Sequence, residues 1–292
     1  MSKHVSLTLH YPEETVECDF TAALSVFPQF KVLPNPITDY FATTASLVKK
    51  IVDTKYANDA EILGLLVLGV VSSAEFYFRS ILSELSDACP LCQHHTEAMT
   101  IPAGSQAFYA GSGFHPMMSA FEHESLADSK KIVGEIKRFV GLSCGGNTSV
   151  KKALDDFELL CELRHCFVHA RGFAGLKAVR AIGGPRNLHK VLIGQSQALD
   201  FIKLSHNAVR AVNKYLSEEI LDRWIEKDVL VGKWSDDKKA FTRYVELFTK
   251  RNETNFDGSL KTAYATVRPA IVKRRQGIAA KVGVLKSEGE ST

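Results

Sequence analysis

Apolar residues recur at helical spacing through one long segment, and this periodicity constrains the fold more than any other feature. Residues 61–85 keep that spacing and contain a ten-residue apolar run at 62–71. A helix that crosses a bilayer needs about 20 apolar residues, so the run predicts a buried core helix and no membrane span. Asn58 or Asp59 can cap its first turn.

Three further segments have the same period. They are residues 125–142, 150–170 and 196–227, and Thr148 or Ser149 can cap the second of them. Residues 87–117 are rich in turn-forming residues and predict a loop. The periodicity therefore predicts an all-α bundle with four main helices between about residues 58 and 228.

The two ends of the chain differ from this body. Residues 1–40 contain two short alternating stretches, VSLTLHY and TVECDF, followed by Pro28, Pro34 and Pro36, which break regular structure. We expect a β-rich N-terminal appendage over 1–40, a helical bundle over 41–230 and a basic helical C-terminal extension over 231–292. Pro269 should interrupt the second helix of that extension.

Charge and cysteine content bound the function. The net charge of the 292-residue chain is +3, but residues 231–286 hold thirteen Lys or Arg against five Asp or Glu. Such a basic stretch is typical of a polyanion-binding surface. Six irregularly spaced cysteines predict reduced thiols. With no export signal at the start, we expect a cytoplasmic protein.

The stretch ELRHCFVHARG places Arg164, His165 and His169 on a helix that otherwise builds the core. The period predicts that Leu154, Phe157, Leu160, Cys161 and Val168 form the buried side of this helix.

Three interpretations of the stretch are open. The three side chains can belong to a solvated polar face. Glu162, His165 and His169 can share a face and bind a metal, but Cys166 stands where zinc proteases carry their catalytic glutamate. The third interpretation is cleavage of RNA without metal, which needs a base, an acid and a cation at the phosphate. Imidazole, with a pKa near about 6.5, and guanidinium supply these groups.

The order arginine, polar residue, three residues, histidine at 164–169 resembles the motif of HEPN domains, the higher eukaryote and prokaryote nucleotide-binding helical bundles. The resemblance covers roughly residues 58–228 and implies a four- to five-helix bundle with the motif on the penultimate core helix. It also implies a homodimeric, cofactor-free endoribonuclease that leaves a 2′,3′-cyclic phosphate and a 5′-hydroxyl. Such enzymes act as toxins or anti-phage effectors, often with an antitoxin or defence-system partner.

The resemblance also implies roles for single residues. Arg164 would hold the scissile phosphate, His169 would act as general base or acid, and His165 would orient the phosphate. Glu75 would tune His169, and Arg79 would contact RNA. Five residues span about 140° on a helix, so Arg164 and His169 of one chain diverge, and a second copy would complete the cleft. The alternative is a non-catalytic nucleotide- or protein-binding HEPN module.

Two other clusters carry weaker signals. Cys89, Cys92, His94 and His95 in CPLCQHH form half of a zinc site, which His115 or His123 could complete, but the irregular segment favours free thiols in a loop over a metal site. In the C-terminal extension, Tyr244, Phe248, Phe256 and Tyr264 should form a small core rather than stack on bases. Lys273, Arg274 and Arg275 are the predicted contacts with the RNA backbone.

Overall fold

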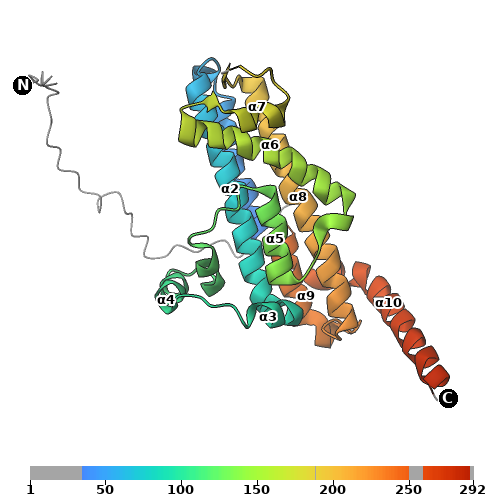
Figure 1. Ribbon diagram of the computed structural model, residues 1–292. Coiled ribbons are helices and arrows are strands. Elements are labelled where there is room, and N and C mark those ends of the chain that lie inside the picture. Colours follow the sequence, from blue (N-terminus) through green and yellow to red (C-terminus); the bar gives the residue numbers. More distant parts are fainter. Residues whose placement is uncertain (1–34, 188, 250–258, 290–292) are drawn as a thin grey trace, which may run out of the picture. The chain divides into compact units, whose positions relative to one another are not determined.

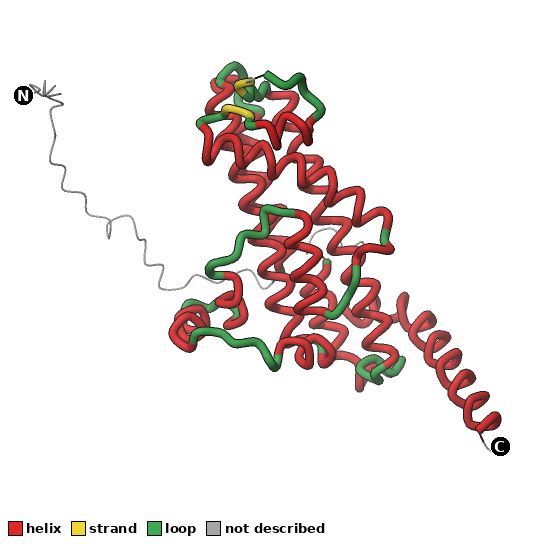
Figure 2. Tube along the Cα trace, in the orientation of Figure 1, coloured by secondary structure: helices red, strands yellow, loops and turns green. Residues whose placement is uncertain are grey.

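The structure, a computed structural model, describes residues 35–187, 189–249 and 259–289. Within them the chain is mainly helical, with two short strands and connecting loops, which confirms the all-α class (Figures 1 and 2). The predicted N-terminal strands lie outside the described residues. The elements are α1 (Pro36–Ile51), α2 (Ala60–Ala88), α3 (Pro90–Thr96), α4 (Ala103–Gly111), α5 (Ser129–Val140), α6 (Thr148–Ala170), β1 (Phe173–Ala174), α7 (Leu176–Ile182), β2 (His189–Lys190), α8 (Gln195–Glu226), α9 (Trp234–Phe248) and α10 (Leu260–Gly289).

The four predicted main helices correspond to α2, α5, α6 and α8. Asp59 caps α2 as predicted, because its carboxylate accepts the N–H groups of Glu61 and Ile62 at 3.2 and 3.0 Å. The cap of α6 is one residue earlier than predicted: Asn147 accepts the N–H of Val150 at 3.0 Å. These caps satisfy amide groups that a helix start otherwise leaves without partners.

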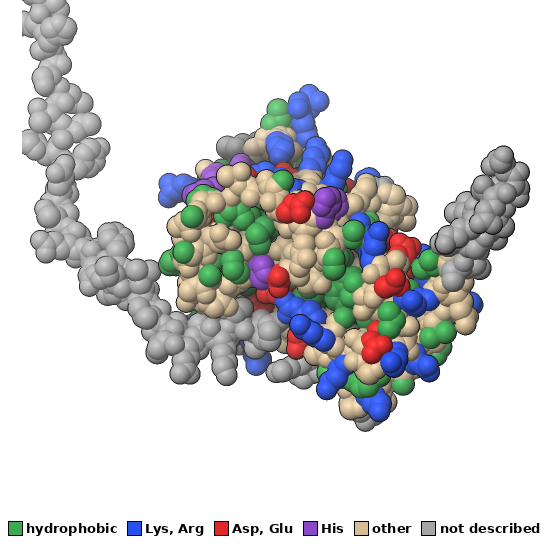
Figure 3. Space-filling model, turned by 90° about the horizontal axis from the view of Figure 1, so that it is seen from below, with side chains coloured by type: hydrophobic (Ala, Val, Ile, Leu, Met, Phe, Trp, Pro, Cys, Tyr) green, Lys and Arg blue, Asp and Glu red, His purple; other side chains and the backbone are tan. Residues whose placement is uncertain are grey.

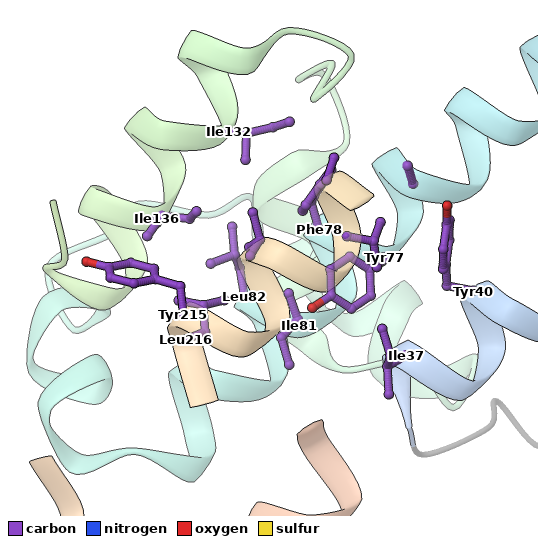
Figure 4. Packing of buried hydrophobic residues seen from close by; sticks show 14 of the residues in the cluster. Ile37, Tyr40, Tyr77, Phe78, Ile81, Leu82, Ile132, Ile136, Tyr215 and Leu216 are labelled. Carbon is purple, nitrogen blue, oxygen red and sulfur yellow. The ribbon is translucent and has the colours of Figure 1, made fainter. Parts of the chain in front are cut away.

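The core of the bundle is built around α2, which packs against α1, α5, α6 and α8. Figure 4 shows aromatic and branched aliphatic side chains of α1, α2, α5 and α8 packed between these helices. Tyr77, Phe78 and Ile81 of α2 are almost completely buried there. In the described residues, α2 alone is long and apolar enough to cross a membrane, but it packs in this core. The hydrophobic effect at these contacts is the main stabilising contribution.

Two predictions about irregular segments are wrong. Residues 87–117 are not simply a loop, because α3 and α4 lie within them. Pro36 does not break the helix but opens α1, since a proline in the first turn lacks only an N–H that has no helical acceptor. The first residues of α1, 36–40, fall within the segment that was predicted to be β-rich.

The C-terminal helices belong to the same compact unit as the bundle, Val32–Thr292. Phe248 of α9 and Tyr264 of α10 are buried in the core and Tyr244 packs against it, which confirms a packing role for these aromatic residues. The fourth, Phe256, lies outside the described residues. Pro269 lies inside α10, so the predicted interruption of that helix is wrong. Pairing with α8 and α9 holds the helix across the proline.

Candidate functional site

Arg164, His165 and His169 lie on the last two turns of α6. The two imidazole rings are neighbours, with centroids 4.5 Å apart and planes tilted by 46°. Both histidines are exposed, whereas Arg164 is half-buried. Residues four apart share a helix face, so His165 and His169 form one exposed pair and Arg164 faces the same side as Val168.

The buried side of α6 differs from the prediction near its C-terminal end. Val168 was expected in the core but is 48% exposed, whereas Leu163 and Cys166 are buried. The ring of Phe167 lies against Gly64 of α2, where an added Cβ would be 2.6 Å from a ring carbon. Because Phe167 faces α2, its neighbour Val168 turns outward.

A short segment covers the end of α6. This cover segment, residues 171–191 without Leu188, contains β1, α7 and β2, which Figure 1 shows beside the C-terminal end of α6. The two strands pair antiparallel, with Phe173 opposite Lys190. Cys166 of α6 packs with Ala174, Ala178 and Val179 in a second small core. The cover segment is therefore fixed next to the histidine pair.

Glu75 and Arg79 pair with each other rather than with the motif. Arg79 donates to Glu75 at 2.7 Å, and Glu75 also accepts the N–H of Leu126 at 2.8 Å. Glu75 is eleven residues from Gly64, about 16 Å along α2, and Gly64 is level with Phe167. Burial raises the pKa of the Cys161 thiol, and Glu158, Asp128 and Glu75 raise it further, so the structure places Glu75 nearer Cys161 than His169.

The candidate metal ligands do not converge. In the described ranges, no group of three or more His, Cys, Asp and Glu side chains could hold a metal ion. Glu162 is buried and pairs with Lys177 instead of facing the histidines. Cys89 and Cys92 are fully buried, while the side chain of His94 is 75% exposed. The Cys92 thiol donates to Cys89 and lowers the pKa of Cys89 to about 6.

The predicted RNA contacts of α10 lie far from the motif. Arg274 pairs with Asp222 and Glu226 near the end of α8, at 3.7 and 3.3 Å, and Arg275 pairs with Asp228. The motif is near the start of α8, so the two places are separated by about 40 Å of helix. Lys and Arg side chains also lie among Asp and Glu side chains over the lower right of the face in Figure 3.

The sequence prediction missed three arginines of the cover segment. Arg171, Arg180 and Arg186 are exposed and lie in the segment that follows the motif. The signal was present in the sequence, because residues 163–199 contain six Lys or Arg and no Asp or Glu. The basic excess of the cover segment was overlooked because residues 231–286 form a longer stretch that holds more cations.

Comparisons with protein-family models, with curated proteins and with solved structures give no match. A function is therefore proposed from the residues of this chain and from their geometry.

Proposed function

We propose that the chain is a metal-independent endoribonuclease of the HEPN type. The observation that carries the proposal is an exposed pair of imidazoles, His165 and His169, beside a guanidinium without an ion-pair partner in the described part of the chain. These groups lie at the end of the third of the four main helices. The resemblance of the motif and the helical class support the same proposal.

The three side chains supply the groups that RNA cleavage needs. One imidazole accepts the proton of the ribose 2′-hydroxyl, and the 2′-oxygen attacks phosphorus. The bond between phosphorus and the 5′-oxygen then breaks, and a protonated imidazole donates its proton to that oxygen. The Arg164 guanidinium neutralises the negative charge that accumulates on the phosphorane oxygens. The products are a 2′,3′-cyclic phosphate and a 5′-hydroxyl.

A second copy of the chain would complete the site. Leu65 follows Gly64 on α2, and Val168 follows Phe167 on the antiparallel α6, so both side chains turn to one side of the helix pair. They are 60% and 48% exposed, and this apolar face also carries Arg164. A second copy packed on it would bury both side chains and bring Arg164 of one protomer towards His169 of the other.

Cleavage assays with motif variants test the proposal. Labelled RNA is incubated with the protein and a chelator, and the cyclic phosphate is identified by mass spectrometry. His169→Ala and Arg164→Ala should each lower the cleavage rate by about 10²-fold or more, because proton transfer and charge neutralisation are lost. Far-UV circular dichroism should show unchanged helix content.

His123→Ala is the matched control, since His123 is also exposed but lies before α5, away from the motif. It should cleave at the wild-type rate. Undiminished cleavage by both motif variants would contradict the proposal. A wild-type chain that binds RNA and cleaves none would instead support the non-catalytic binding module.

A further inference from the structure

Four arginines have no hydrogen-bond, ion-pair or ring partner within the part of the chain that the structure describes. All four lie in or beside the cover segment: Arg164, Arg171, Arg180 and Arg186. The other described arginines pair with carboxylates, backbone carbonyls or an aromatic ring. The unpartnered guanidinium groups are thus concentrated at one end of the bundle.

Nothing in the neighbouring sequence neutralises these arginines. Between Glu162 and Asp200 the chain has no acidic residue. Glu162 forms an ion pair with Lys177, and the Oε1 atom of Glu61 in α2 lies 3.2 Å from Nζ of Lys190. The carboxylates that reach the segment therefore pair with its lysines. Its arginines remain available to an external anion, and guanidinium matches the geometry of phosphate oxygens.

The backbone at Arg171 gives an independent argument. This residue ends α6 in the left-handed region, with φ 51° and ψ 35°. Glycine adopts that conformation more readily than any residue with a Cβ, by about 1 kcal/mol. The fold thus favours glycine at this position, and the exposed guanidinium forms no hydrogen bond or ion pair within the described residues. A ligand outside the chain would account for the arginine.

An exposed aromatic ring lies in the same segment as these cations. Phe173 of β1 is 42% exposed and follows Arg171 by two residues, while its neighbour Ala174 faces the small core. Exposed aromatic rings among cations are typical of surfaces that bind single-stranded nucleic acids, where bases stack and phosphates contact the cations. In a duplex the bases are already paired and stacked on one another, so they would not stack on this ring.

We propose that the cover segment binds single-stranded RNA, with Arg171, Arg180 and Arg186 contacting phosphates and Phe173 stacking on a base. The bound strand leads to the His165–His169 pair, which adjoins the segment. The inference deepens the proposed function and rests on it for the choice of RNA. Binding itself is measured without cleavage.

Fluorescence anisotropy with a short labelled single-stranded RNA tests the surface. Its 2′-hydroxyls are methylated, so the native chain cannot cleave it. Affinity is measured at several salt concentrations for the wild type and for Arg171→Gly/Arg180→Gln/Arg186→Gln. The plot of log affinity against log salt should become shallower by about 0.7 for each phosphate that no longer binds an arginine. Phe173→Ala should weaken binding without changing this slope.

The matched control is Lys151→Gln/Lys214→Gln, which removes exposed cations that already pair with carboxylates on their own helices. Its slope and affinity should equal those of the wild type. The proposal is overturned if the triple variant, folded by circular dichroism, binds the RNA like the wild type. It is also overturned if the triple substitution reduces binding to phosphatidylserine vesicles but not to RNA.

Failure of this proposal differs from failure of the proposed function. Loss of cleavage in His169→Ala with unchanged binding of the triple variant would refute the surface alone. Normal cleavage by the His169 and Arg164 variants with weakened binding of the triple variant would refute the catalytic assignment alone.

Discussion

His115 is held in its neutral form by a hydrogen bond and by burial. Its Nδ1 accepts the N–H of Met117 at 3.2 Å and caps the short 3-10 helix Pro116–Phe121. Burial lowers the pKa of His115. The carboxylates of Glu84 and Asp87 on α2 partly oppose that shift, and Arg243 of α9 adds to it. Protonation of Nδ1 would also remove the acceptor that the cap needs.

This histidine predicts a pH dependence of stability. Below an unfolded-state pKa of about 6.5, the unfolded chain binds a proton that the folded chain resists, so the free energy of unfolding falls as the pH falls. His115→Asn keeps a capping acceptor but does not titrate. Urea denaturation should show a smaller loss of stability between neutral and mildly acidic pH for this variant. An equal loss in both proteins would refute the assignment to His115.

At the scale of elements, one buried carboxylate joins α9 to α10. Asp237 is fully buried and accepts the N–H groups of Val231 and Gly232, each at 2.8 Å, and the hydroxyl of Tyr264. Arg268 of α10 donates to the Gly232 carbonyl at 2.8 Å. These bonds fix α10 against the start of α9.

Asp237→Ala should lower the free energy of unfolding by at least about 2 kcal/mol, because two amide groups and a hydroxyl would be buried without partners. Chemical denaturation monitored by circular dichroism measures the change. The control is Asp236→Ala at the exposed neighbouring position, expected within about 0.5 kcal/mol of the wild type. Equal stability of the two variants would show that Asp237 does not stabilise this junction.

Features of the elements that depend on local sequence could be predicted better than features that depend on tertiary contacts. Asp59 could be recognised as a helix start, because a capping carboxylate acts within one turn. The outward orientation of the Val168 side chain could not be predicted, since it depends on the packing of Phe167 against Gly64 of α2. Pro269 stays helical for a similar reason, because α10 packs against α8 and α9.

The candidate site could be predicted in part. The spacing of Arg164, His165 and His169 on one helix was visible in the sequence, and the structure confirms that helix. The positions of Glu75 and Arg274 could not be predicted, because their partners Leu126, Asp222 and Glu226 are brought to them only by folding. The sequence shows where cations are concentrated, but it does not show which of them form ion pairs with carboxylates in the fold.

At the scale of the whole molecule, the proposed site depends on two copies of the chain. Arg164 and His169 of one copy diverge by about 140° around α6, so their side chains do not point towards the same place from one helix. The apolar face at Leu65 and Val168 is where a second copy would pack. If each site takes its arginine from one protomer and its histidine from the other, two inactive variants can complement one another.

Mixing the inactive Arg164→Ala and His169→Ala chains after co-refolding should therefore restore cleavage. Random pairing makes about half of the dimers mixed, and each mixed dimer has one intact site of two, so about a quarter of the wild-type rate is expected. Mixing Arg164→Ala with the double variant Arg164→Ala/His169→Ala is the control, because no pairing yields an intact site. Sedimentation shows whether the two single variants form dimers. If they form dimers that stay inactive, the motif does not act across the interface.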